Sequence, residues 1–257
     1  MNKILNINSE LEHNTIDTLG AMEYAPNYHE WILDEFKPHI GRKVVEVGSG
    51  TGSITKKLFD YNLEKLVAIE PSELVYNKLN EVVFEYIKDK NKTETEFIAI
   101  NSYLSDSKEN LQNIGINTFI YINVLEHIED DLAELKLMYT ILEEGGKILI
   151  FVPALQCLFG THDANVGHYR RYYKKELKNK VEIAGFKIEK IKYFDFLGII
   201  PWWIAFKLLK IKFLKDGQSK IYDKMIVPLE RFIEQKMAPV VGKNLLLVAV
   251  KQQGKPI

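Results

Sequence analysis

The sequence contains one cysteine, Cys157, and almost no net charge. A single cysteine cannot close a disulfide within the chain, so we expect a protein of the reducing, cytoplasmic compartment. The 34 basic and 35 acidic residues leave a formal charge of -1, which provides no general attraction to phosphate polymers. We therefore expect no nucleic-acid partner.

Long apolar runs are also missing. The longest uncharged apolar run covers residues 196–206, whereas a helix needs about 20 residues to cross a bilayer. The first residues, MNKILNINSELEHN, lack the apolar core of a signal peptide. These absences argue against a membrane span and favour a soluble chain.

The sequence shows instead a regular alternation of short β-branched runs with longer amphipathic segments, in a chain of 257 residues that is 46% hydrophobic. This length suits one α/β domain, and the alternation indicates βαβ units. The short runs are nearly all apolar, as parallel strands buried on both faces should be, and cover residues 43–47, 66–70, 96–100, 118–122 and 147–152. Helices are predicted between them over residues 52–61, 72–90 and 130–142.

The C-terminal part departs from this alternation. Residues 185–194 alternate as a strand, and residues 244–251 form another apolar strand. If the two pair antiparallel at the sheet edge, residues 195–242 are a helical cap insertion, because ordinary connections have only about 4 to 6 residues. The prolines of this insertion should separate its short helices, at Pro201, Pro228 and Pro239.

A glycine-rich loop follows the first predicted strand. In VVEVGSGTG, Gly48, Gly50 and Gly52 stand at alternate positions, and a helix follows at once. Such a turn lets a ligand approach the backbone closely, and the amides at the helix start can bind an anionic group. Glu70 ends the second predicted strand, where a carboxylate can accept hydrogen bonds from a ribose diol.

Two ligands are compatible with this loop, S-adenosyl-L-methionine and a dinucleotide such as NAD. Gly48 and Gly50 also begin a dinucleotide fingerprint, but Ser53 stands where that fingerprint prefers a third Gly or Ala. Alternate glycines after Glu46, with an acid about 20 residues further on, favour S-adenosyl-L-methionine. An NAD-dependent oxidoreductase is kept as an alternative.

Five motifs, spread over roughly residues 24–195, resemble those of class I S-adenosylmethionine-dependent methyltransferases, especially a bacterial branch of the type 11, 12 and 23 families: VVEVGSGTG, VAIEPS, INVLEHIEDD, LEEGGKILIFVPA and GHYRRYYKKEL. The resemblance implies a Rossmann-like α/β fold with a seven-stranded, mostly parallel sheet, helices on both faces and the helical cap. It also implies a methyltransferase domain over residues 41–257 after an N-terminal helical segment over residues 1–40. A non-catalytic S-adenosylmethionine-binding protein is a further alternative.

The resemblance also implies which residues bind the cofactor. The glycine loop, the second-strand acid and the end of the fourth strand carry over to Glu46, Gly48, Ser49, Gly50, Gly52, Glu70, Pro71 and Asn123. Asn101 and Ser102 stand where the family often has an Asp that bonds the adenine amine. Either side chain can still accept a hydrogen bond from that amine.

Two histidines are candidates for a general base. Methyl transfer needs a base only when the acceptor is a hydroxyl or a protonated amine. His127 follows the fourth strand, where the crevice of such a sheet opens, although Glu126 and His127 could equally cap the next helix. His168 lies in a dense polar loop after the fifth strand. No metal site is expected from His162, Asp163 and His168, because cysteines and further clustered carboxylates are missing.

The polar loop covers residues 160–172 and should carry substrate contacts. The candidates for binding the acceptor are Tyr169, Arg170 and Arg171. The arginines could grip a carboxylate or phosphate of the acceptor. Alternatively, they pair with Asp163 or Glu176 and order the loop.

Aromatic segments lie on both sides of these motifs. Tyr24, Tyr28 and Trp31 precede the first strand on a predicted helix that either faces the sulfonium of the cofactor or packs on the sheet. Residues 196–215 combine a Trp pair with several lysines, which suits a lid, a peripheral membrane contact or a cap buried on its own domain. We therefore expect a small-molecule, lipid-like or glycan-precursor acceptor, and the oligomeric state is left open.

Overall fold

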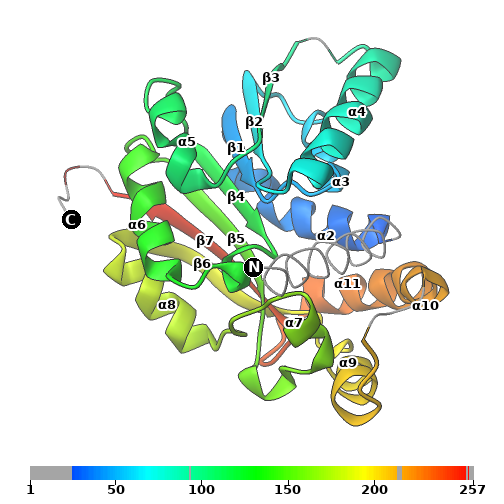
Figure 1. Ribbon diagram of the computed structural model, residues 1–257. Coiled ribbons are helices and arrows are strands. Elements are labelled where there is room, and N and C mark those ends of the chain that lie inside the picture. Colours follow the sequence, from blue (N-terminus) through cyan, green and yellow to red (C-terminus); the bar gives the residue numbers. More distant parts are fainter. Residues whose placement is uncertain (1–24, 93, 213–215, 253, 255–257) are drawn as a thin grey trace, which may run out of the picture.

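The computed structural model describes residues 25–257, apart from residues 93, 213–215, 253 and 255–257. The sheet has seven strands in the order β3-β2-β1-β4-β5-β7-β6 (Figure 1). The first five strands are parallel, and β7 runs antiparallel between β5 and β6, so the predicted class I architecture is confirmed. The strands are β1 (Lys43–Val47), β2 (Lys65–Ile69), β3 (Glu96–Ile100), β4 (Thr118–Ile122), β5 (Lys147–Pro153), β6 (Phe186–Phe194) and β7 (Asn244–Lys251).

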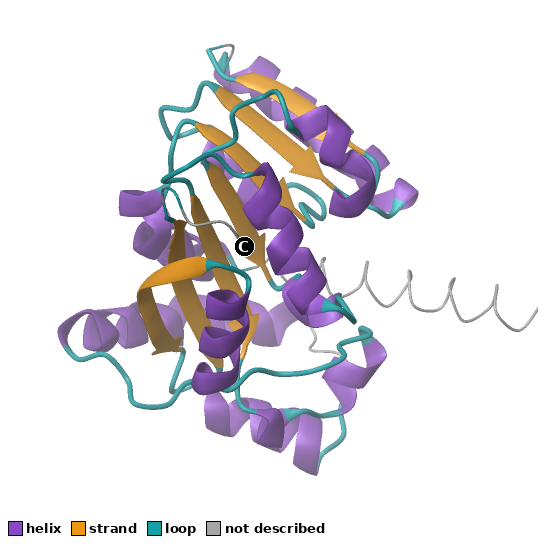
Figure 2. Ribbon diagram, turned by 90° about the vertical axis from the view of Figure 1, so that its left-hand side faces the viewer, coloured by secondary structure: helices purple, strands orange, loops and turns teal. Residues whose placement is uncertain are grey.

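The sheet is buried on both faces, which explains why its strands are continuous apolar runs. Successive strand residues point to opposite faces, so Val44 and Val45 of β1 pack in two different hydrophobic clusters. Figure 2 shows helices on both sides of the sheet. These helices provide the long crossovers that parallel strands require.

The predicted helices between the strands are present with slightly different bounds. α3 (Ser53–Leu58), α4 (Glu73–Lys90) and α6 (Asp131–Ile141) match them, and Ser72 and Asp130 cap the last two by accepting hydrogen bonds from Val75 and Ala133 amides. Two helices were not predicted, α5 (Leu104–Leu111) and α7 (Thr161–Asn165). Outside the cap, the described residues also form α2 (Pro26–Phe36), α8 (Lys174–Ile183) and the short 3-10 turns η1 (Lys37–His39), η2 (Leu125–His127) and η3 (Gln156–Leu158).

In the part of the chain that the structure describes, the segment between β6 and β7 forms a helical cap. It contains α9 (Ile199–Trp202), the π-helical turn η4 (Trp203–Leu208), α10 (Asp216–Ile221), the π-helical turn η5 (Tyr222–Ile226) and α11 (Val227–Lys236). The prediction that its prolines separate short helices is wrong at two of three positions. Pro201 lies in the first turn of α9, where an amide N–H has no partner within the helix. Pro228 lies just after the π-helical turn η5, which continues into α11 without a break.

The cap is attached to the body of the protein through the buried carboxylate of Asp195. This carboxylate accepts hydrogen bonds from the hydroxyls of Tyr28 (2.8 Å) and Tyr222 (2.6 Å) and pairs with the Lys243 ammonium at 2.6 Å. Burial opposes the ionisation of Asp195, but Lys243 and these hydroxyls lower its pKa overall. Three elements, α2, η5 and the loop before β7, therefore meet at one charge.

The aromatic residues of α2 serve packing. Trp31 is buried, with its ring centroid 3.8 Å from that of Phe194, and Tyr28 stacks edge-on against the same ring. Tyr24 lies outside the described residues. No helix among those the structure describes is both long and apolar enough to cross a bilayer.

Candidate active site

The glycine loop after β1 adopts a backbone that only glycine takes easily. The φ angles of Gly48, Gly50 and Gly52 are 68°, 54° and 85°, in the left-handed region. A Cβ atom on Gly48 would lie 2.4 Å from Cγ2 of Val124, which follows β4. The loop is therefore packed directly against the segment that leads from β4 to the candidate base His127.

Glu70 lies just beyond the end of β2, one residue outside the strand, and its side chain reaches the glycine loop. Its carboxylate accepts hydrogen bonds from the amides of Gly50 (2.9 Å) and Ser72 (3.0 Å). Burial raises the pKa of Glu70, and the two amides counteract that rise. A side-chain-free backbone beside a carboxylate is the surface that an aminoacyl nucleoside with a ribose diol requires, so the residues fit S-adenosylmethionine.

Glu46 stabilises the glycine loop through hydrogen bonds. Its buried Oε2 accepts a hydrogen bond from Thr55 Oγ1 at 2.5 Å, and its carbonyl oxygen accepts one from Ser49 Oγ at 3.2 Å. Burial raises the pKa of Glu46 to about 8, although the Thr55 and Ser49 hydroxyls oppose the rise. Thr55 was missed by the sequence analysis, since nothing local distinguishes it from other polar residues on α3.

The remaining cofactor candidates lie at the ends of β2, β3 and β4. Asn101 donates from Nδ2 to the carbonyl oxygens of Glu70 (2.9 Å) and Pro71 (3.1 Å), which joins β3 to the ribose side of the site. Ser102 donates to the Tyr103 carbonyl oxygen at 2.9 Å. Asn123 has a left-handed φ of 54° directly after β4. Their contacts with the cofactor stay predictions.

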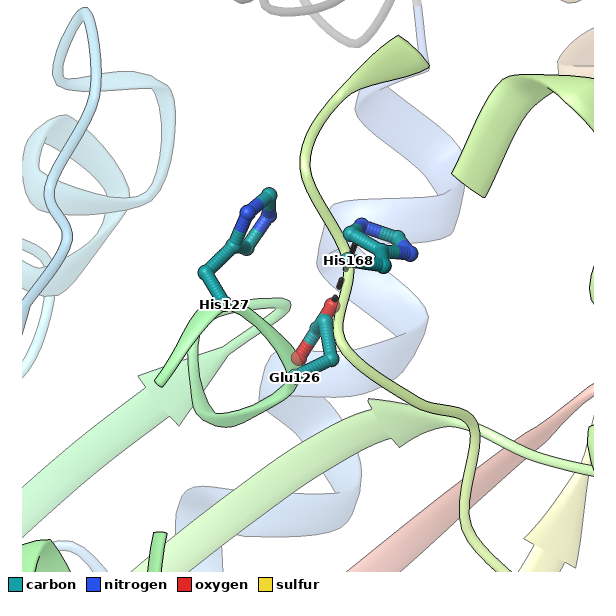
Figure 3. A group of neighbouring side chains, drawn as sticks. All are labelled: Glu126, His127 and His168. Carbon is teal, nitrogen blue, oxygen red and sulfur yellow. Dashed lines mark ion pairs between the residues drawn. The ribbon is translucent and has the colours of Figure 1, made fainter. Parts of the chain in front are cut away.

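Glu126 and His168 lie together beyond the ends of β4 and β5. His168 Nδ1 lies 2.9 Å from Asp163 Oδ1, and its Nε2 lies 3.8 Å from Glu126 Oε1 (Figure 3). Glu126 is fully buried, which raises its pKa to about 7 despite the proximity of His168 and Arg171. The interpretation of Glu126 as a cap of the next helix is wrong, because Asp130 caps α6.

His127 and Tyr169 are more accessible members of the same group. The imidazole of His127 is exposed and packs edge-on against His168, with ring centroids 4.5 Å apart. Partial desolvation and the neighbouring imidazole of His168 lower the pKa of His127. Tyr169 is 52% exposed, and its amide donates to the Glu126 carbonyl oxygen at 2.8 Å. The structure thus brings both candidate bases together.

Both candidate arginines are engaged within the protein. Arg171 is 1% exposed, donates from Nε to Asp163 Oδ1 at 2.8 Å, and lies over the Trp202 ring at 4.7 Å. Arg170 donates to two carbonyl oxygens of the β4–α6 loop and pairs with Asp131 at 3.0 Å. These contacts favour the loop-ordering role over a grip on the acceptor, which requires a free guanidinium.

The glycine loop, the Glu70 carboxylate and the parallel sheet with one antiparallel strand define a class I S-adenosylmethionine-dependent methyltransferase. A model of the methyltransferase domain (Methyltransf_23) matches residues 22–191. The chain therefore belongs to this methyltransferase family, whose cofactor is S-adenosylmethionine. No curated protein matches it in sequence. The dinucleotide interpretation of the loop gains no support from these comparisons.

Solved structures share the fold at low sequence identity. A SAM-dependent methyltransferase from Archaeoglobus fulgidus is 16% identical over 85% of this chain and 91% of its own, with a TM-score of 0.53. A chain in the complex of the Haloferax volcanii Trm112 methyltransferase activator with a methyltransferase is 12% identical over 97% and 99%, with a TM-score of 0.61. A Haemonchus contortus phosphoethanolamine N-methyltransferase 2, crystallised with phosphomonomethylethanolamine and S-adenosylhomocysteine, is 16% identical over 88% of this chain and 53% of its own, with a TM-score of 0.56.

Proposed function

We propose that this protein transfers the methyl group of S-adenosylmethionine to a lipid-like acceptor, which includes a lipid-linked glycan precursor, at the surface of an anionic membrane. One observation supports the proposed class of acceptor. The cap packs its inner face on the polar loop of residues 160–172, the acceptor loop, and presents an apolar outer face to solvent. The methyl transfer itself rests on the family and on the fit of the glycine loop and Glu70. The compartment that we propose is the cytoplasmic one.

The chain's own residues supply positioning and a proton acceptor. The loop of residues 48–52 and Glu70 hold the cofactor, which supplies an electrophilic methyl group when bound. Because the leaving group is a neutral thioether, the protein needs no acid, and alignment of the acceptor provides most of the rate. His168, whose Nδ1 contacts Asp163, and His127 beside it are the groups that we propose as acceptors of a proton from a hydroxyl or ammonium acceptor.

The inner face of the cap is bound to the acceptor loop. The rings of Trp202 and Phe206 lie 5.1 Å and 4.9 Å from the ring of His162, between centroids. Thr161 Oγ1 donates to the Ile211 carbonyl oxygen at 2.6 Å. A ligand bound at the cap is therefore close to the loop that contains His168.

The outer face of the cap has two exposed apolar stripes at helical spacing. The first contains Ile200, Trp203, Ile204, Leu208 and Leu209, and the second contains Ile221, Met225, Leu229 and Phe232. Exposed lysines follow the first stripe at positions 210 and 212, whereas Lys207 is also exposed but donates to the Cys157 carbonyl oxygen at 2.6 Å. An apolar stripe bordered by lysines is typical of a helix that lies in the interface of an anionic membrane.

The acceptor class is tested by following radioactive methyl groups. Purified protein and methyl-labelled S-adenosylmethionine are incubated with the organic-soluble or the water-soluble fraction of a bacterial extract. We expect label in the organic-soluble products. Label only in water-soluble products contradicts the lipid-like acceptor, and no label with either fraction contradicts catalysis.

Membrane contact is tested separately by vesicle co-sedimentation. We expect binding to phosphatidylglycerol vesicles but little to phosphatidylcholine vesicles, and loss of binding in Ile204→Ser/Leu208→Ser. Phe84→Ser is the matched control, because Phe84 is 60% exposed on α4, away from the cap. Equal binding by the cap variant and the control variant contradicts the membrane proposal.

A further inference from the structure

Glu126 is a buried carboxylate. Its side chain is fully buried, and among the residues that the structure describes neither Oε1 nor Oε2 has a hydrogen-bond partner. Buried polar groups in proteins are nearly always paired, since an unpaired buried charge costs several kcal/mol. His168 and Arg171 lie near Glu126, but no described group donates to its carboxylate at hydrogen-bond distance.

The imidazole facing Glu126 has the wrong polarity to satisfy it when neutral. The Asp163 carboxylate also accepts hydrogen bonds from Arg171 Nε at 2.8 Å and from the Gly160 amide at 2.9 Å, so it faces His168 as an acceptor. The His168 Nδ1–H group donates to this carboxylate, which leaves the lone pair of Nε2 directed at Glu126 Oε1, 3.8 Å away. A metal cation in this gap would bind both of these acceptors.

His127 completes a set of three ligand atoms. One atom from each of Glu126, His127 and His168 lies within 4.8 Å of the other two. Figure 3 shows the two imidazoles side by side above the carboxylate, with η2 supplying two of the residues and the loop after α7 supplying the third. Ligands at about 2.0–2.2 Å from one ion are about 3.0–3.5 Å apart, so a small contraction of this set would enclose an ion.

We propose that Glu126, His127 and His168 bind a divalent first-row transition-metal ion, with Asp163 as the positioning residue for His168. Two imidazoles and one carboxylate suit Zn²⁺, Fe²⁺ or Co²⁺ and leave open coordination positions. A carboxylate that fixes the outer nitrogen of a ligating histidine is the usual support of such sites. The ion occupies the gap between Nε2 of His168 and Oε1 of Glu126 and supplies the charge that Glu126 lacks. With the ion bound, His127 and His168 serve as ligands in place of proton acceptors.

The proposed ion lies next to the cofactor loop. Val124, two residues before Glu126, is the side chain that packs against Gly48. An open position on the ion can bind and orient an oxygen of an acceptor molecule. This inference does not rest on the proposed lipid-like acceptor, because metal binding is measured on the protein alone.

The experiment titrates untagged, metal-free protein with Co²⁺ and records the visible absorption bands of the bound ion, with Zn²⁺ competition as a second measurement. We expect one equivalent to bind. Glu126→Gln and His168→Asn should lose the bands, and Asp163→Asn should weaken binding about 10- to 100-fold. His39→Asn is the matched control, because His39 pairs with Glu189 outside the site.

Adenosylhomocysteine titration reports whether each variant is folded. If Glu126→Gln does not fold, His127→Ala is measured instead, since the His127 side chain is exposed and its removal leaves the core intact. A folded variant that binds Co²⁺ as tightly as the unaltered protein overturns the proposal. Absence of any Co²⁺ or Zn²⁺ binding overturns it as well.

Discussion

The carboxylate of Glu70 accepts a hydrogen bond from the backbone amide of Gly50, 20 residues earlier in the chain, at 2.9 Å. This bond joins the end of β2 to the glycine loop, so that one acid both shapes the loop and faces the expected ribose. The ribose diol can replace or share the amide as a donor when the cofactor binds.

Replacing Glu70 by alanine should weaken the binding of adenosylhomocysteine about 10- to 100-fold. Hydrogen bonds to a charged group contribute about 1.5–3 kcal/mol, and 1.4 kcal/mol corresponds to a factor of ten. Isothermal titration calorimetry measures the change. Glu73→Ala is the control, since Glu73 is an exposed carboxylate three residues further on. Equal effects of the two variants would falsify the ribose assignment.

Replacing Gly48 by alanine should destabilise the protein through two separable effects. The left-handed φ of 68° costs about 1–2 kcal/mol for a residue with a Cβ atom, and the contact with Val124 adds about 1–3 kcal/mol of overpacking. Urea unfolding measures the sum. Gly145→Ala, at a φ of 78° with nothing within 4 Å of the new atom, should show only the first effect.

Adding Val124→Ala to Gly48→Ala tests the second effect directly. Because the smaller side chain makes room for the new Cβ atom, the double variant should unfold at a higher urea concentration than the sum of the single effects predicts. Simple additivity would show that Val124 does not restrict Gly48.

Stability without cofactor should depend on the ionisation of Glu46. Its pKa is raised to about 8, so between its unfolded pKa of about 4.3 and its folded pKa of about 8 the folded protein binds up to one more proton than the unfolded chain. The contribution of Glu46 to the free energy of unfolding is fully present below about pH 4.3. It is lost as the pH rises toward about 8, by at most about 1.4 kcal/mol per pH unit. Glu46→Gln should therefore gain stability relative to the unaltered protein between about pH 5.5 and pH 7.5.

Urea unfolding at those two pH values measures this difference. Glu64→Gln is the control, because the Glu64 side chain is 43% exposed and pairs with Arg42 at the surface. If the difference between Glu46→Gln and the unaltered protein is the same at both pH values, Glu46 is ionised alike in the folded and unfolded chains.

Removing Arg171 should be among the most destabilising changes in the acceptor loop. Arg171→Met leaves the fully buried Asp163 without its nearest guanidinium, and breaking a buried pair costs about 3–5 kcal/mol. Arg42→Met removes an ion pair of a side chain that is 60% exposed and should cost no more than about 1 kcal/mol. Equilibrium unfolding compares the two. A small loss in Arg171→Met argues for an arginine that is available to the acceptor.

Loss of the Tyr222 hydroxyl should loosen the cap. This hydroxyl donates to Asp195 at 2.6 Å, and its removal takes a donor from a buried charge at a cost of about 1–3 kcal/mol. Hydrogen–deuterium exchange of Tyr222→Phe should show faster exchange over residues 216–236 than over the sheet. Tyr86→Phe is the control, since the Tyr86 hydroxyl contacts an exposed carboxylate.

The sequence by itself determined the order of strands and helices and the cofactor loop. Parallel strands are buried on both faces, so residues such as 43–47 and 118–122 are recognisable as continuous apolar runs whatever surrounds them. The glycines of the loop are required by a local turn, and Glu70 follows its strand at the spacing that the fold imposes. These features depend on neighbours close in the chain, and for that reason they were predictable.

The tertiary structure alone decided the roles of the polar residues after β4 and β5. Sequence patterns treated Arg171 as a possible substrate residue and Glu126 as a possible helix cap, whereas both side chains are buried in one cluster with Asp163 and His168. Burial of a charge depends on which distant segments fold over it, and no local spacing records that. The same contacts set the pKa of each group and therefore its chemistry.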